Sequence, residues 1–97
     1  MNQIFLIGRI KDIISGEKKK GILLEVERPF REGENKLIDI FLCELWNSIF
    51  EKTINLCSIG DIIAIKGRVY IEDLKYCVIG ENVVLLNKYK NNILKNN

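Results

Sequence analysis

Short apolar runs separated by polar segments recur along the whole chain and predict a protein built mainly from β-strands. Residues 4–10 read IFLIGRI, with apolar side chains on both faces of the strand, and Gly8 marks a bulge or bend within it. The Glu-Val-Glu run at 25–27 alternates as a half-exposed strand does. We predict five strands, at residues 4–10, 22–28, 37–45, 62–71 and 74–86.

Polar segments with turn residues connect these runs. Residues 11–20 contain Ser-Gly and three consecutive lysines, which predicts a loop. Pro29 is expected to end the second strand, and residues 31–36 are expected to form a flexible connection. Glu72 and Asp73 predict a very tight hairpin between the last two strands.

The hydrophobic period changes between the third and fourth strands. Apolar residues at positions 49, 50 and 54 recur at helical spacing, which predicts a helix over residues 47–56. We expect Asn47 or Ser48 to cap this helix, with Glu51 completing a capping box.

The predicted order of elements is β-β-β-α-β-β. Five strands with one short helix between the third and fourth are the layout of the OB-fold, an all-β, partly open Greek-key barrel. Because 97 residues leave no room for a second core, we expect one domain over residues 1–87. Residues 88–97 are rich in Lys and Asn and predict a loosely ordered C-terminal extension.

The residue types that most enzymes use are scarce. The chain has no histidine, so the usual general base and the commonest metal ligand are both missing. Its cysteines, Cys43, Cys57 and Cys77, are widely spaced and match neither a zinc site nor a disulfide framework. We therefore interpret them as small buried hydrophobes and expect no enzyme, no cofactor and no metal.

The charge distribution restricts where a polyanion could bind. The net charge is only +2, all 13 acidic residues lie within residues 1–87, and three of the 15 basic residues lie in 88–97. A polyanion site on the domain must therefore be a local patch. The longest apolar run is four residues and the first residues show no signal-peptide pattern, so we expect a cytoplasmic protein that does not enter the membrane.

Four segments, in the correct order and spacing, resemble the bacterial single-stranded DNA-binding protein family. They are MNQIFLIGRI at 1–10, RPF at 28–30, DIFLCELWN at 39–47 and IGDIIAIKGRVY at 59–70. The resemblance covers about residues 1–87 and implies a homotetramer that binds single strands without sequence preference. It also implies a role in DNA replication, recombination or repair in the bacterial cytoplasm or nucleoid.

The chain departs from that family in two respects. It has neither the long linker nor the acidic tip that recruits replication and repair proteins, and its last hairpin is shorter than usual. It therefore resembles the short, tail-less members of the family or the dimeric primosomal replication protein B type. An OB-fold adaptor that contacts protein, or an RNA-binding module, is the alternative function.

Binding of single strands without sequence preference requires exposed aromatic rings for stacking. Trp46 stands where the third strand meets the helix, and Phe30 lies between two arginines. The resemblance implies stacking aromatics at both positions, whereas the structural alternatives are a partly buried core or interface Trp46 and a Phe30 folded onto the barrel rim. Tyr70 and Tyr76 flank the hairpin, either as a cross-strand pair or as a small platform. Ile40 stands where relatives often carry a stacking Trp.

Phosphate contacts require cations beside these rings. The strand-associated candidates are Arg9, Arg28, Arg31, Lys66 and Arg68. The lysine triplet at 18–20 is either a solvated charge run or a clamp over the bound strand.

The first strand carries more apolar surface than a small barrel can bury, since residues 4–7 are apolar on both faces. This surplus predicts a subunit interface.

Overall fold

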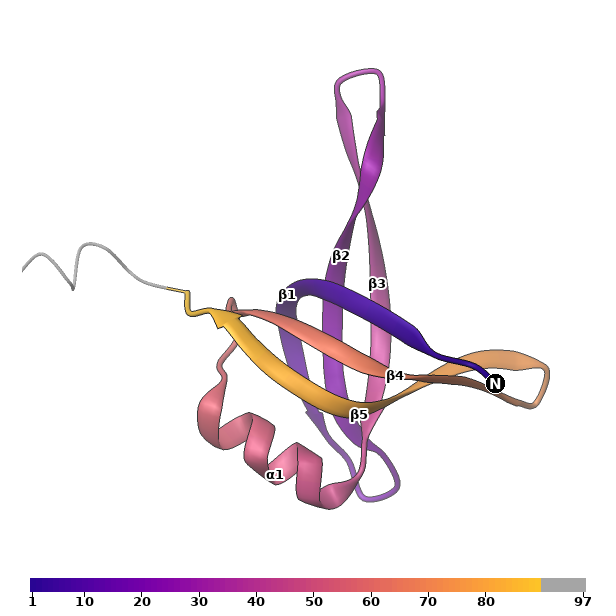
Figure 1. The fold of residues 1–97 in the computed structure, drawn as a ribbon, viewed down its shortest axis with the longest axis vertical. Helices are drawn as coiled ribbons and strands as arrows, with labels where there is room; N and C mark the ends of the chain where they lie inside the picture. The colour runs from indigo at the N-terminus through magenta and orange to yellow at the C-terminus, as the bar shows by residue number, and fades with distance from the viewer. Residues whose placement is uncertain (90–97) are drawn as a thin grey trace, which may run out of the picture.

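In a computed structural model of the chain, the structure describes residues 1–89, apart from the side chains of Arg31 and Glu32. The elements are β1 (Ile4–Ser15), β2 (Lys20–Glu32), β3 (Asn35–Leu45), α1 (Asn47–Leu56), β4 (Ile62–Glu72) and β5 (Lys75–Asn87). The strands close into a barrel in the order β1-β2-β3-β5-β4 (Figure 1). Only the contact between β3 and β5 is parallel. This confirms the predicted five-stranded OB-fold with one helix between β3 and β4.

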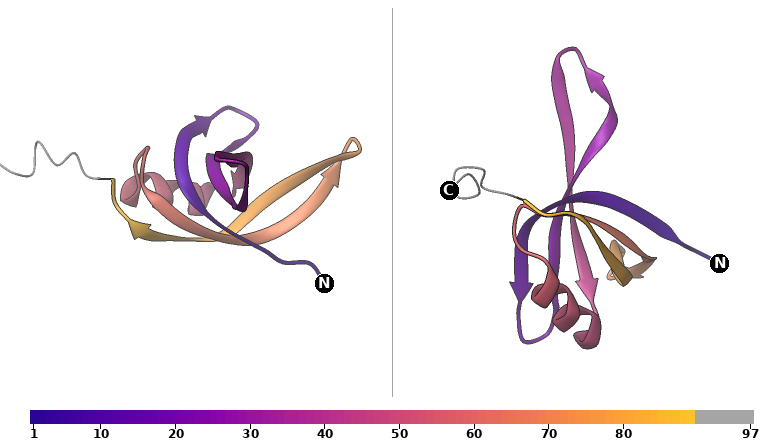
Figure 2. Two further views of the ribbon diagram at one scale, coloured as in Figure 1. Left: turned by 90° about the horizontal axis from the view of Figure 1, so that it is seen from above. Right: turned by 60° about the vertical axis from the view of Figure 1, so that its left-hand side comes forward.

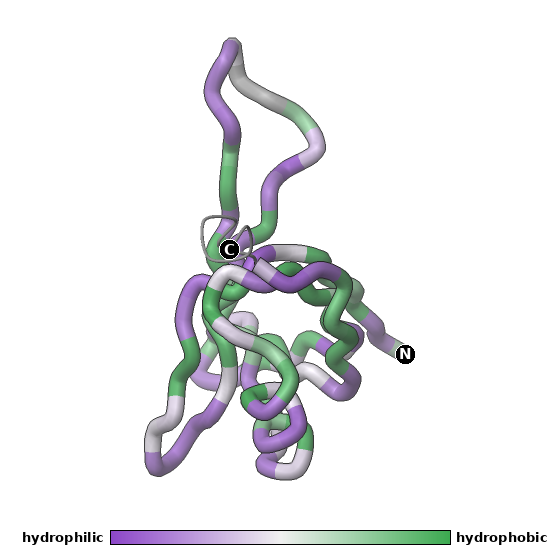
Figure 3. The backbone as a smooth tube through the Cα atoms, turned by 90° about the vertical axis from the view of Figure 1, so that its left-hand side faces the viewer, coloured by the Kyte–Doolittle hydropathy of each residue, from purple (hydrophilic) through white to green (hydrophobic). Residues whose placement is uncertain are grey.

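The core lies inside the barrel, where alternate residues of each strand meet. Its fully buried aliphatic side chains are Ile10, Ile22, Leu24, Ile63 and Ile65. In Figure 3 the apolar stretches gather in the ring of strands, whereas the far tip of the β2–β3 hairpin is hydrophilic. Helix α1 adds the buried ring of Phe50 to the same cluster. Alternation of the side chains thus leaves a second set of residues on the outer surface.

Gly8 permits the close approach of two strands. A β-carbon at this position would lie 2.1 Å from the carbonyl oxygen of Glu25 on β2, a distance that no side chain tolerates. The regular pairing of β1 with β2 is instead interrupted further along, by a register shift between Ile10 and Asp12. The predicted bulge at Gly8 is therefore wrong in position, and β1 continues to Ser15 where a loop was expected.

Beyond the barrel, β2 and β3 continue as a protruding two-stranded arm, which we define as residues 28–37 (Figure 2). The prediction that Pro29 ends β2 is wrong, and so is the flexible connection predicted at 31–36. The register shifts between Glu27 and Arg31, and a proline tolerates such a bulge because it has no N–H to pair. Pairing resumes at Arg31 and Lys36, and the strands turn tightly at Gly33.

The remaining connections are also short. Helix α1 has the predicted bounds, but its N-cap is Trp46 and no side chain caps it, so the predicted capping box is wrong. The turn between β4 and β5 lies at Asp73 and Leu74, both with positive φ, one residue later than predicted. This hairpin projects to the side opposite the helix (Figure 2). Within residues 1–89, no helix is long and apolar enough to cross a membrane.

Candidate nucleic-acid interface

An apolar strip follows the outer face of β3 from the arm to the helix. It consists of Ile38, Ile40, Leu42 and Trp46, alternate positions whose side chains are all about half exposed. Trp46 continues the alternation because its backbone is still extended. At about 3.3 Å per residue, the strip is about 26 Å long. We call these four residues the β3 strip.

Trp46 combines an anchored backbone with an accessible ring. Its carbonyl oxygen accepts the first hydrogen bond of α1, from the backbone N–H of Phe50 at 2.8 Å. Its side chain is 50% exposed. The structure thus gives the ring the exposure that base stacking requires, and Trp46 is not a core residue of the barrel.

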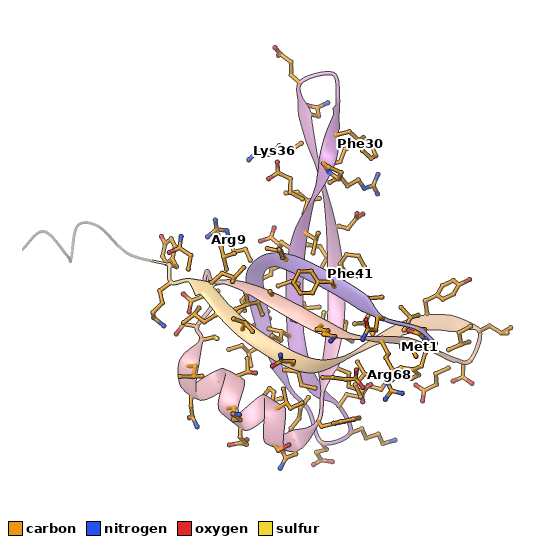
Figure 4. The ribbon with its side chains drawn as sticks, in the orientation of Figure 1. Met1, Arg9, Phe30, Lys36, Phe41 and Arg68 are labelled. Carbon is orange, nitrogen blue, oxygen red and sulfur yellow. The ribbon has the colours of Figure 1, made fainter. Side chains whose placement is uncertain are left out.

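Phe30 lies on the arm, away from the barrel. Its ring is 59% exposed, so it does not fold back onto the rim. In Figure 4, Phe30 and Lys36 point to opposite sides of the arm. Arg31, which the sequence places beside Phe30, has a side chain that lies outside the described residues.

A cavity of about 200 Å³ opens beside the β3 strip. The β1–β2 connection, β3 and the β4–β5 hairpin form its walls. Its lining residues are Ile14, Lys19, Lys20, Ile40, Phe41, Leu42, Glu44, Tyr70, Tyr76, Cys77 and Val78. Apolar, aromatic, basic and acidic groups therefore meet in one recess, which we call the strip cavity.

Lys20 is the cation best placed for a phosphate in the strip cavity. Its Nζ donates to the side-chain oxygen of Asn47 at 2.9 Å and lies 5.7 Å from the centre of the Phe50 ring. None of the described carboxylates pairs with it. Lys19, in contrast, forms an ion pair with Glu72 at 3.1 Å, which raises the pKa of Lys19. Within the lysine triplet, Lys19 is therefore paired with a carboxylate, whereas Lys20 is available to a ligand.

Tyr70 and Tyr76 both line the strip cavity, but they are not a cross-strand pair. Tyr70 is opposite Cys77, and Tyr76 is opposite Ile71. Residues that are opposite each other on two paired strands have side chains on the same face, and successive residues of one strand point to opposite faces. The side chains of Tyr70 and Tyr76 therefore leave the backbone on opposite faces of the hairpin. The interpretation as a structural pair is therefore wrong. Tyr76 is 83% exposed, whereas the Tyr70 hydroxyl donates to Glu44.

Two of the predicted arginines are neutralised by carboxylates. Arg28 makes two hydrogen bonds to Asp39, at 2.7 and 2.9 Å, and this contact lowers the pKa of Asp39. Asp39 alternates with the strip residues, so the pair lies on the other face of β3. Arg68 pairs with Glu81 at 2.8 Å. Each carboxylate therefore offsets the charge that its arginine could offer to a phosphate.

Arg9 and Lys66 lie on other parts of the barrel. Arg9 donates to the carbonyl oxygen of Gly60 at 2.7 Å. It is opposite Ile62 in β4, and Arg68 lies six residues further along that strand, which is about 20 Å away (Figure 4). Lys66 is opposite Phe5 and has an exposed side chain on the outer face of β4. The structure therefore does not bring the five predicted cations together.

The two sides of the β3 strip differ in charge. On the β2 side, Glu25 and Glu27 are opposite Ile40 and Ile38. Lys36 pairs with Glu27 at 3.6 Å. On the other side lies the strip cavity with Lys19 and Lys20. Lys20, which pairs with none of the described carboxylates, therefore gives the cavity side an available cation for a polyanion.

Several residues of this interface were missed from the sequence. Ile38, Leu42 and Glu44 were not predicted as site residues, and Lys20 was considered only as part of the lysine triplet. The signal for the strip was available, since alternation over 37–45 places residues 38, 40 and 42 on one face. The sequence offered no signal for Glu44, because its role depends on a contact with Tyr70, 26 residues away.

The thiols are unsuited to nucleophilic chemistry. Cys43 and Cys57 are buried, as predicted, whereas Cys77 is only partly buried. Loss of hydration on burial raises the pKa of Cys43 to about 12, which keeps it protonated. Within the described part of the chain, no cluster of three or more acidic or cysteine side chains could hold a metal ion.

No protein-family model and no curated protein matches the sequence. Solved structures do match the fold. The mitochondrial single-stranded DNA-binding protein Rim1 of S. cerevisiae matches with a TM-score of 0.68, covering 91% of this chain and 96% of Rim1 at 14% identity. The chain has the fold of single-stranded DNA-binding proteins.

Two further solved structures share this fold. A small single-stranded DNA-binding protein from Mycoplasma pneumoniae matches with a TM-score of 0.63 over 87% of this chain and 92% of its own, at 21% identity. The dimeric N-terminal domain of PriB from Thermoanaerobacter tencongensis matches with a TM-score of 0.57 over 90% and 98%, at 22% identity. These likenesses confirm the fold that the sequence resemblance implied.

Proposed function

We propose that this protein binds single-stranded DNA, largely without sequence preference, and protects it during replication, recombination or repair. The single observation that carries the proposal is the half-exposed Trp46 ring at the end of the β3 strip. It lies in a fold that single-stranded DNA-binding proteins share. No step of this function makes or breaks a covalent bond, so the protein acts as a binding protein and not as an enzyme.

In this proposal the strand runs along the cavity side of the β3 strip. Bases stack on the rings of Trp46 and Tyr76 and contact Ile40 and Leu42. Stacking suits any sequence because every base has a π-face, and each stack contributes about 1–3 kcal/mol. Lys20 contacts a phosphate, and neutralising phosphates releases counterions, so affinity falls as salt rises.

The arm extends this path beyond the barrel. Phe30 offers a further stacking ring, and Arg28 and Arg31 are the cations that the sequence places beside it. Arg9, Lys66 and Arg68 remain predicted phosphate contacts for a strand that continues around the barrel.

We further propose that the protein is a homo-oligomer, a tetramer or else a dimer, in the bacterial cytoplasm or nucleoid. The outer face of β1 supports this, because Phe5 and Ile7 are exposed there. Several binding sites in one assembly would let a single strand bind to them in turn, which raises the overall affinity.

Fluorescence titration tests the proposal directly, since Trp46 is the only tryptophan. We expect oligo-dT to quench its emission strongly at low salt, and added salt to reverse the quenching. Duplex DNA of equal length should have little effect. Absence of quenching at micromolar protein in low salt would overturn the proposal, and a response to RNA alone would favour the RNA-binding alternative.

Substituting Trp46 separates stacking from folding. Trp46→Ala should weaken oligo-dT binding by one stacking increment, roughly tenfold, in an anisotropy assay with labelled DNA. Trp46→Phe should recover most of that loss because a flat ring is restored. The circular dichroism spectrum should be unchanged in both variants, and unfolding of the alanine variant would show that the ring is structural.

A further inference from the structure

The strip cavity contains a carboxylate, which is unusual in a site proposed for a polyanion. Glu44 lines the cavity on β3, between Leu42 and Trp46 of the β3 strip. Its side chain is only partly exposed. Close to a phosphate this charge would oppose binding, so it favours binding only if it faces a hydrogen-bond donor of the ligand.

Tyr70 fixes the orientation of this carboxylate. The Tyr70 hydroxyl donates to one carboxylate oxygen, Oε1, from strand β4, which lies beyond β5 in the barrel. The hydrogen bond with Glu44 raises the pKa of Tyr70 to about 12, so the phenol keeps its proton and stays a donor at neutral pH. Within the part of the chain that the structure describes, the second oxygen, Oε2, accepts no hydrogen bond.

Around this oxygen the cavity is suited to the flat face of a base. Ile40, Leu42 and Val78 provide apolar contacts, and Tyr76 provides an aromatic ring at the rim. Lys20 supplies the positive charge for the phosphate on the same nucleotide. The recess therefore combines apolar walls with a carboxylate oxygen whose orientation Tyr70 fixes.

We propose that Glu44 makes the strip cavity a subsite that prefers a base with an exocyclic amino group, as in cytosine or adenine, over thymine or uracil. An amino group donates an N–H to Oε2, and cytosine N4 is a donor that carboxylates accept. Thymine and uracil place the carbonyl oxygen O4 at that position. Two acceptors would then face each other, and the carboxylate would gain a donor only if the base shifted to present its N3–H.

This inference rests on the proposed binding of single strands and adds one selective position to it. Stacking on Trp46 and Phe30 is indifferent to the base, whereas the subsite is not. The protein should therefore bind every sequence, but bind cytosine-rich strands more tightly than uracil-rich ones.

The test compares oligo-dC with oligo-dU of equal length at neutral pH, using Trp46 emission as the signal. These pyrimidines differ at the 4-amino group and the adjacent N3, and the comparison avoids the methyl group of thymine. We expect oligo-dC to bind about five- to tenfold more tightly to the unmodified protein. In Glu44→Gln the preference should fall below about twofold, mainly through weaker oligo-dC binding.

Glu72→Gln is the matched control. It removes the same charge from a glutamate close by, which pairs with Lys19 and does not line the cavity. It should keep the preference and bind both oligonucleotides slightly more tightly, because Lys19 becomes free for phosphate. Equal loss of preference in both glutamine variants would assign the effect to net charge and overturn the proposal.

The outcomes also separate this inference from the proposed function. If the unmodified protein binds oligo-dC and oligo-dU equally, the preference is wrong and single-strand binding stands. If it binds neither, the proposed function itself fails. The comparison of oligo-dC with oligo-dU on the unmodified protein still tests the preference if a variant does not fold. If a folded Glu44→Gln protein retains the preference for oligo-dC, another group selects the base and the proposal is wrong.

Discussion

Asp61 is the most buried charged side chain among the described residues, with 1% of its surface exposed. Three donors surround its carboxylate. The backbone N–H groups of Tyr89 and Ser58 donate at 2.6 and 2.8 Å, and Lys88 Nζ donates at 3.3 Å. Through these contacts Asp61 holds the chain that follows β5 against the turn before β4. The ring of Tyr89 lies over Gly60, whose positive φ and missing side chain leave room for it.

The ionised form of Asp61 is required for this arrangement. Burial by itself would raise the pKa of Asp61, but the donors outweigh it and the pKa is lowered. A carboxylate with a lowered folded-state pKa stabilises the fold above its unfolded pKa, about 3.9. That stabilisation is lost as the pH falls from there toward the folded-state pKa.

We therefore predict that Asp61→Asn destabilises the protein by about 2–3 kcal/mol near neutral pH, since an amide cannot replace a charged acceptor of three hydrogen bonds. The loss relative to the unmodified protein should shrink below about pH 4. Urea unfolding near neutral pH and below about pH 4 measures the difference in unfolding free energy between the variant and the unmodified protein. Asp73→Asn, the same change at an exposed turn position, is the control and should cost little. Equal effects of the two variants would contradict the role of Asp61.

At the scale of single residues, the sequence predicted the aromatic part of the candidate site better than the charged part. Trp46, Phe30 and Tyr76 are exposed as the stacking hypothesis requires. The state of an arginine depends instead on which carboxylate the fold brings to it. Arg28 meets Asp39 only because of the register between β2 and β3, and a single sequence does not determine that register in advance.

The β2–β3 arm is the element that the sequence predicted least well. Pro29 is a strong local signal for the end of a strand, but here the bulge places it where no N–H is needed. Pairing between Arg31 and Lys36 then continues the hairpin outward. The helix over residues 47–56 and the strands of the barrel were predicted because their signals are local periodicities.

The arm should be dispensable for folding but needed for full affinity. Glu27 and Ile38 are opposed in the β2–β3 ladder, so an Asn-Gly turn inserted between them can replace residues 28–37 and close a shorter hairpin. We expect the unfolding free energy to change by less than about 1 kcal/mol, because no core residue is removed. Oligo-dT affinity should fall roughly tenfold, the contribution of one stacked base.

Phe30→Ala in the intact arm is the matched variant for this deletion. If stacking on Phe30 accounts for the effect of the arm, the two variants should bind oligo-dT with similar affinity. A much larger loss on deletion would show that the arginines of the arm contribute as well. Unchanged affinity in the shortened protein would remove the arm from the proposed interface.

The molecule as a whole exposes a second group of apolar residues, which meets the β3 strip where Ile7 and Ile38 line one groove. It lies on the outer face of β1, β4 and β5, where Ile7, Ala64 and Val84 form one cross-strand row. Phe5 and Leu86 extend it, and both are exposed. Lys66, opposite Phe5, interrupts this group and Ala64 is buried, but four exposed apolar side chains on one face support the proposed homo-oligomer. We call these five residues the β1 face.

A charge placed on the β1 face should break the assembly. We predict that the unmodified protein scatters light as a species of roughly four times the 11.2 kDa chain mass, or twice for a dimer. Ile7→Glu should reduce it to a smaller species, because a buried unpaired carboxylate costs several kcal/mol at an interface. Leu42→Glu is the matched control, since Leu42 lines the strip cavity and is 47% exposed, close to the 49% of Ile7. It should keep the full mass while weakening DNA binding.

Equal masses for the unmodified protein and Ile7→Glu would mean that the β1 face is not the interface. A monomeric unmodified protein would rule out the oligomer and leave each chain to bind its single strand alone.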